Sequence, residues 1–164
     1  YEITAHINPT CSTGDRDGVL IAHGDATCGY SLFVRDGRLV HDLNIGGTHQ
    51  LVASDVTIPA AAATLGFRMR RAGDGPFPHG IGTLLIDGEA AGEMETDQIF
   101  WLMISWSGLD IGLDRGTTVA DYDGSGRHLG PNTYQGDLVR VSVDLVPDQD
   151  VDHDAAGATE LGRE

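Results

Sequence analysis

The sequence predicts an all-β protein, a two-sheet antiparallel sandwich of the jelly-roll kind, and two observations carry this prediction. The first is composition: the 164 residues include 23 glycines and only 3 methionines, which favours many turns over a helical bundle. The second is a period-two alternation of apolar and polar residues in short runs between turn residues, which is typical of half-buried antiparallel strands. About ten such runs bury their apolar faces best as two packed sheets.

The predicted strands follow one another with short turns between them. They cover residues 1–7, 18–24, 30–35, 38–44, 49–54, 64–71, the two arms of 82–94, and 138–145. Two turns contain an Asp-Gly pair, Asp36-Gly37 and Asp87-Gly88, and each predicts a β-hairpin because glycine supplies the positive φ that the turn demands. Pro59 precedes four alanines and leaves room there for a turn at most.

The alternation also predicts which side chains point into the core. Successive side chains of a strand lie on opposite faces of the sheet, so the apolar set of each strand faces inward. In the three clearest runs the expected core residues are Ile3, Ala5, Ile7, Leu65, Phe67, Met69, Val139, Val141, Val143 and Leu145.

We expect one domain over residues 1–146, since a chain of this length can bury a sizeable core. Residues 147–164 are acidic and almost without large apolar side chains, so burial cannot offset the entropy of ordering them, and we expect an acidic C-terminal tail. Residues 1–7 already form a strand-like run, so we expect the chain to be part of a longer protein.

The charge of the chain excludes two classes of partner. There are 25 acidic and 10 basic residues, a formal net charge of −15, and every basic residue is arginine. Such a surface repels phosphate backbones and anionic lipids, so neither nucleic acid nor a membrane is expected as a partner. No run of 18 apolar residues is present either.

Four stretches, in this order, resemble the C-terminal domain of large bacterial arylsulfatases, a laminin-G-like or concanavalin-like sandwich. The first is CGYSLFVRDGRL, residues 28–39, and the second is GTLLIDG, residues 82–88. The third is GLDIGLDRG, residues 108–116, and the last is YQGDLVRVSV, residues 134–143. Together they span most of the expected domain.

The resemblance implies a non-catalytic accessory domain that packs against an N-terminal sulfatase catalytic domain and stabilises it. The parent protein would hydrolyse sulfate esters, whereas this chain alone would not be catalytic. An independent carbohydrate-binding, lectin-like module is the alternative, and a homo-oligomer stays open. A self-standing glucanase is a weaker reading, because its Glu-x-Asp-x-x-Glu strand signature is absent and the clustered Glu89, Glu93 and Glu95 only follow a hairpin turn.

Residues 11–16, CSTGDR, have the residue types of a nucleophile loop without its spacing. Sulfatases need Cys-x-Pro-x-Arg, with the cysteine oxidised to formylglycine, but here the proline is missing and Arg16 follows Cys11 by five positions. The phosphatase loop Cys-x5-Arg places its arginine one position later, before a helix. We therefore interpret these residues as a polar loop between two strands.

Asp110, Asp114, Asp121 and Asp123 form a carboxylate set with metal-like spacing. Calcium takes six to eight oxygen ligands, which loops between sandwich strands can supply. The piece Asp121-Tyr122-Asp123-Gly124 imitates the start of an EF-hand loop but lacks its later acidic positions. A calcium site here is thus a hypothesis beside the simpler interpretation of a solvated loop, and no other cofactor is expected.

Trp101 and Trp106 lie in the apolar run IFWLMISW. An indole ring can stack on the apolar face of a sugar, so the pair is a candidate ligand-binding platform, although a core position or an interface with a neighbouring domain fits the apolar surroundings better.

Cys11 and Cys28 lie at opposite ends of the expected strand 18–24, about 20 Å apart at ~3.3 Å per residue. A disulfide needs Cα atoms within about 7 Å, so two free thiols are expected. Free thiols are typical of a reducing compartment, which predicts a cytoplasmic location.

Overall fold

The computed structural model describes residues 1–9, 16–72, 79–97 and 107–145, which form ten strands and no helix. The strands are β1 (Glu2–Ile7), β2 (Gly18–Asp25), β3 (Cys28–Arg35), β4 (Arg38–Ile45), β5 (Thr48–Ala53), β6 (Thr64–Ala72), β7 (His79–Ile86), β8 (Glu89–Thr96), β9 (Leu109–Ile111) and β10 (Leu138–Asp144). Every strand range expected from the sequence contains a strand, and the described part of the chain holds no helix that could cross a membrane. The expected tail, residues 147–164, lies outside the described residues.

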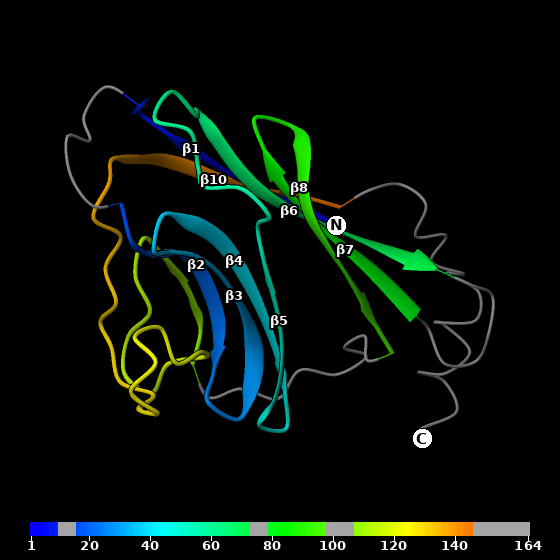
Figure 1. Cartoon of the computed structure of the whole chain (residues 1–164). Helices are drawn as coiled ribbons and strands as arrows, with labels where there is room; N and C mark the ends of the chain where they lie inside the picture. The colour runs from blue at the N-terminus through cyan, green and yellow to red at the C-terminus, as the bar shows by residue number, and fades with distance from the viewer. Residues whose placement is uncertain (10–15, 73–78, 98–106, 146–164) are drawn as a thin grey trace, which may run out of the picture.

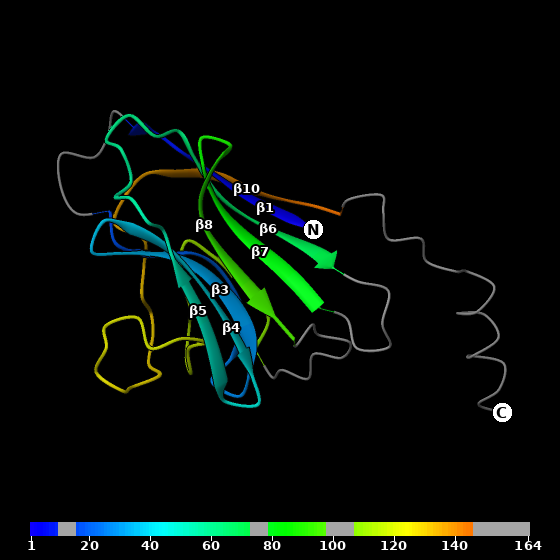
Figure 2. The same cartoon turned by 45° about the vertical axis from the view of Figure 1, so that its right-hand side comes forward.

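The strands form two antiparallel sheets packed face to face (Figures 1 and 2). Sheet A has the order β10-β1-β6-β7-β8 and sheet B the order β5-β4-β3-β2-β9. At one side of the sandwich the two sheets are joined by a backbone hydrogen bond of 2.7 Å from Asp55 to the carbonyl of Ala91. The predicted two-sheet sandwich is confirmed.

Both predicted Asp-Gly hairpins are present. Asp36 and Gly37 have φ of 52° and 68°, and Asp87 and Gly88 have φ of 50° and 82°, the positive values that a type I′ hairpin turn requires at both central residues. The carboxylate of Asp87 also accepts backbone hydrogen bonds from Ala63 at 2.8 Å and from Thr64 at 2.9 Å, which ties this turn to the start of β6.

The main core lies between the sheets and follows the predicted alternation in β1 and β6. Their predicted inward residues are all buried, and the neighbouring Arg68 and Arg70 lie outside the core. Phe67 is fully buried and stacks on the imidazole of His41 from the opposite sheet, with ring centroids 3.5 Å apart. The inner faces of the two sheets therefore interdigitate at the centre of the sandwich.

The prediction for the last strand was wrong in part. Val139, Val143 and Leu145 are 64%, 46% and 74% exposed, and only Val141 packs against the core. Two causes act. A register shift at His6 and Ile7 places Leu138, rather than Val139, across from Ile7, so Leu138 packs against the core. Val143 lies across from the buried Ile3, but β10 is the edge strand of sheet A, and β9, which ends sheet B on the same side, has only 3 residues. Alternation alone predicts neither a register shift nor whether another layer covers a face.

Candidate functional site

The outer face of sheet B is covered by the segment that follows β9, residues 112–133, here called the covering loop. Figure 1 shows this loop, coloured yellow, beside β2 and β3. Its Val119, Ala120 and Tyr122 form a second apolar cluster with residues of the sheet, and the ring of Tyr122 meets that of Phe33 edge-on at 4.8 Å. The loop is thus packed on the sheet, and residues on both faces of sheet B are buried.

Asp114 is the central side chain of the covering loop. One of its carboxylate oxygens accepts hydrogen bonds from the backbone of Val119 at 2.9 Å and from the hydroxyl of Tyr122 at 2.6 Å. Burial raises the pKa of Asp114, while these two hydrogen bonds act against that rise. The carboxylate therefore closes the loop internally and is only 2% exposed.

The other three candidate calcium ligands serve two turns, Asp110 one and Asp121 with Asp123 the other. Asp110 accepts hydrogen bonds from the guanidinium and the backbone of Arg115, and the guanidinium hydrogen bond holds the pKa of that carboxyl below its usual range. Asp121 and Asp123 accept backbone hydrogen bonds from Ser125 at 3.1 and 2.9 Å. Each carboxylate is thus engaged by donors of its own turn.

No group of three or more His, Cys, Asp or Glu side chains in the described residues is arranged to hold a metal ion. The geometry of these four aspartates therefore gives no support to a calcium site, and calcium binding stays a prediction.

The other candidate residues from the sequence are the tryptophan pair, the CSTGDR loop and the cysteines. Trp101 and Trp106, like residues 11–15 of CSTGDR, lie outside the described residues. Arg16 donates a hydrogen bond of 3.0 Å to the carbonyl of Pro59. Cys28 is half-buried and in no disulfide.

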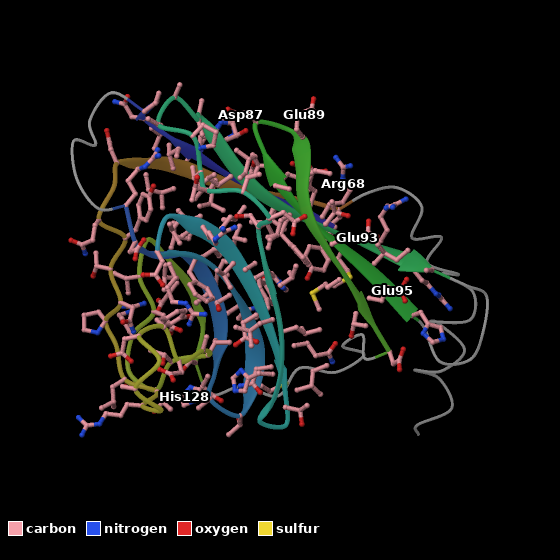
Figure 3. All side chains as sticks on the ribbon, viewed as in Figure 1. Arg68, Asp87, Glu89, Glu93, Glu95 and His128 are labelled. Carbon is pink, nitrogen blue, oxygen red and sulfur yellow. The ribbon has the colours of Figure 1, made fainter. Side chains whose placement is uncertain are left out.

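The glutamates of β8 do not form a pair of facing carboxylates. Glu89, Glu93 and Glu95 are exposed along this edge strand (Figure 3), and Glu93 and Glu95 lie opposite Thr83 and Ile81 on the neighbouring strand. The described residues therefore offer no support for the glucanase reading.

A pair formed by the half-buried His49 and the buried Asp42, beside the covering loop, was missed by sequence reasoning. The Nδ1 atom of His49 lies 2.7 Å from the carboxylate of Asp42, whose side chain is only 1% exposed. His49 stacks on His128 of the loop at 5.5 Å, and His128 in turn contacts the carbonyl of Thr118 at 2.9 Å. Figure 3 shows His128 at the lower end of the molecule.

Two opposing effects act on the pKa of Asp42. Burial raises its pKa, and the hydrogen bond from His49 acts in the opposite direction. A signal for the pair was present in the sequence: Gly46-Gly47 predicts a two-residue hairpin, and that register pairs Asn44 with His49, which places His49 diagonally to Asp42.

A polar pocket of about 410 Å³ opens between the covering loop and the β3–β4 turn. It is lined by Asp17, Gly18, Val34, Arg35, Asp36, Tyr122, Asp123, Pro131, Asn132, Thr133 and Gln135. Three aspartates and one arginine make its lining acidic, and amide and hydroxyl groups supply further donors and acceptors. Such a lining fits a small neutral ligand rich in hydroxyl groups better than an anion.

The chain matches no protein-family model and no curated protein sequence.

Proposed function

We propose that this chain is a non-catalytic accessory sandwich of a sulfatase-like hydrolase, and that it packs against the catalytic domain of the parent protein and stabilises it. The observation that carries the proposal is that the four stretches resembling arylsulfatase C-terminal domains supply turns, loop closures and packing positions of the fold.

Each of the four stretches has a structural task. Residues 28–39 contain the turn at Asp36, and residues 82–88 contain the turn at Asp87. In the third stretch Asp114 closes the covering loop. In the last stretch, a Cβ atom on Gly136 would lie 2.7 Å from the ring of Tyr134, so that position needs a residue without a side chain.

Gly82 shows the same principle in the core. A Cβ atom at this position would lie 2.5 Å from the ring of Phe67, so glycine leaves room for that ring to lie against the neighbouring strand β7. Residues that are required by packing of this kind serve the fold. Their presence in these stretches supports a stabilising role for the domain over a catalytic one.

The proposal is tested first by sequencing the DNA that flanks this segment in its source. We expect an upstream open reading frame, continuous with residue 1, that encodes Cys-x-Pro-x-Arg. The 164-residue chain, assayed with p-nitrophenyl sulfate, is expected to release no nitrophenol above the buffer rate. A flanking frame without that motif, or turnover by the chain alone, would overturn the proposal.

The pocket beside the covering loop favours a second candidate, a carbohydrate-binding module. Its volume of about 410 Å³ has room for one or two sugar rings, and side chains such as Arg35, Asn132 and Gln135 can donate hydrogen bonds to sugar hydroxyls. The acidic lining favours neutral sugars over sulfated ones.

This second candidate is tested by titrating a panel of neutral monosaccharides into the isotope-labelled chain and recording amide chemical shifts. Saturable shifts confined to the pocket residues, lost in Gln135→Ala and retained in the control Gln50→Ala on β5, would support it. Unchanged spectra across the panel would contradict it.

A further inference from the structure

β10 is an edge strand whose outer side has no neighbouring strand among the described residues. An uncovered edge offers a row of backbone donors and acceptors to any strand that can align with it. Figures 1 and 2 show β10, in orange, next to β1 at the margin of sheet A. Its partly exposed Val143 adds apolar surface to this edge.

Within the described part of the chain, the two charged side chains of the strand form no ion pair. Arg140 lies near the Nε2 atom of His6 at 3.2 Å, and no ion pair within the described residues includes it. Asp144 lies directly across from Glu2, a like charge that is itself paired with Arg68. Like charges at opposed positions in a sheet are unfavourable, so an added cation beside Asp144 would stabilise this edge.

The sequence of the strand is complementary to itself in one antiparallel register. When two copies of β10 align about a twofold axis at Ser142, Arg140 of each copy lies opposite Asp144 of the other, and Val141 lies opposite Val143. Shifting the axis by one residue, to Val141, places Arg140 opposite Ser142 and Leu138 opposite Asp144. The first register alone joins opposite charges on one face and apolar side chains on the other.

We propose that β10 is a self-association edge, and that two copies of this chain pair through it, in the Ser142-centred register, to join their A sheets into one continuous sheet. The partner is a second copy because the strand carries both the cation and the anion that the pairing requires. The bulge between His6 and Ile7 of β1 ends the regular part of β10 near Val139, so the contact is short. Short contacts of this kind give weak, concentration-dependent dimers.

A charge-exchange experiment on the 164-residue chain tests the proposal. The variant Arg140→Asp places two aspartates opposite each other at both ends of the pairing, and Asp144→Arg places two arginines there. We expect sedimentation equilibrium to show a wild-type dimer and at least tenfold weaker self-association for either variant. An equimolar mixture of the two variants restores opposite charges at both ends, so we expect it to form a heterodimer.

The controls separate association from folding. Circular dichroism and the melting temperature of each variant should match those of the wild type, and Arg71→Asp on β6, a charge reversal away from β10, should leave the dimer unchanged. A wild type that stays monomeric up to about 1 mM, variants that associate as the wild type does, or a mixture no tighter than the single variants would each overturn the proposal.

A cross-linking experiment tests the register. Ser142 lies opposite its own copy, so Ser142→Cys, in a background with Cys11→Ser and Cys28→Ser, should form a disulfide-linked dimer under mild oxidation. Arg140→Cys in the same background should not, because its counterpart is Asp144. Equal cross-linking of both variants would contradict the Ser142-centred register.

Discussion

The central strands of sheet B, β2 to β4, are buried on both faces, but by different means. The inner face packs apolar side chains such as Leu39 and Leu43 against sheet A, and His41 is a fully buried titratable group within it. The outer face, under the covering loop, buries the polar side chains of Asp42 and Asn44 beside an apolar cluster. Nonspecific burial of apolar surface holds the inner face, whereas directed hydrogen bonds hold the outer one.

This difference shows where the fold tolerates change. On the outer face Asn44 donates hydrogen bonds to Ala26 at 3.0 Å and to Val119 at 3.2 Å, so one side chain joins the sheet to a turn and to the loop. A loss there leaves polar groups without partners. On the inner face, by contrast, the fully buried imidazole of His41 lowers stability by an amount that depends on pH.

The largest effect is expected from His41 on the inner face. Burial lowers the pKa of His41 from 6.5 to about 3, and neither ring nitrogen has a hydrogen-bond partner in the described residues. Below pH 6.5 the unfolded chain binds a proton that the folded chain refuses, so the free energy of unfolding falls by about 1.4 kcal/mol per pH unit from this group. His41→Leu should remove that slope, a change of about 3 kcal/mol between pH 6.5 and about pH 4.

Urea unfolding at a series of pH values, wild type against variant, measures this difference. Because carboxylates titrate in both proteins, only the difference between the two curves reports on His41. Parallel curves through the acidic range would show that His41 is not held neutral in the folded state.

An intermediate effect is expected from Asp114 on the outer face. Asp114→Ala leaves the amide of Val119 and the hydroxyl of Tyr122 without their acceptor, which should lower the free energy of unfolding by about 2 kcal/mol. Asp123→Ala, an exposed aspartate of the same loop, is the control and should stay within about 0.5 kcal/mol of wild type. Equal losses in both variants, measured by chemical denaturation, would remove the distinction between the two aspartates.

The smallest effect is expected from Asp42, also on the outer face. Because burial raises its pKa, the folded chain holds the proton more tightly than the unfolded chain does, and this contribution to stability is lost as the pH rises through the folded-state value. Asp42→Asn should therefore gain stability relative to wild type on going from pH 4 to pH 7, by about 1 kcal/mol or less. A relative loss over the same range would mean that the contact with His49 outweighs burial.

The sequence contained enough information for the strands and for most of the inner core. The alternation in β1 and β6 and the two Asp-Gly turns depend on neighbouring residues, and local rules predict such features well. The exposure of Val139 and Val143 was not predictable in this way, because Val139 lies at a register shift against β1 and Val143 depends on how far sheet B extends at its β9 edge.

The outer face of sheet B could not be predicted from strand patterns either. Alternation assigns Asp42 and Asn44 to a solvent face, and the structure buries them only because a loop about 70 residues later folds over them. The metal-like spacing of the four aspartates was a pattern of the same loop, and in the structure it corresponds to several separate turns. Contacts between distant segments decide such sites, and a single sequence does not contain them explicitly.

We propose that this sandwich stabilises the catalytic domain of a longer parent protein. Differential scanning calorimetry of that parent protein, with and without residues 1–146, tests the proposal. We expect the deletion to lower the melting temperature of the catalytic domain by several degrees. An unchanged melting temperature after the deletion would contradict it.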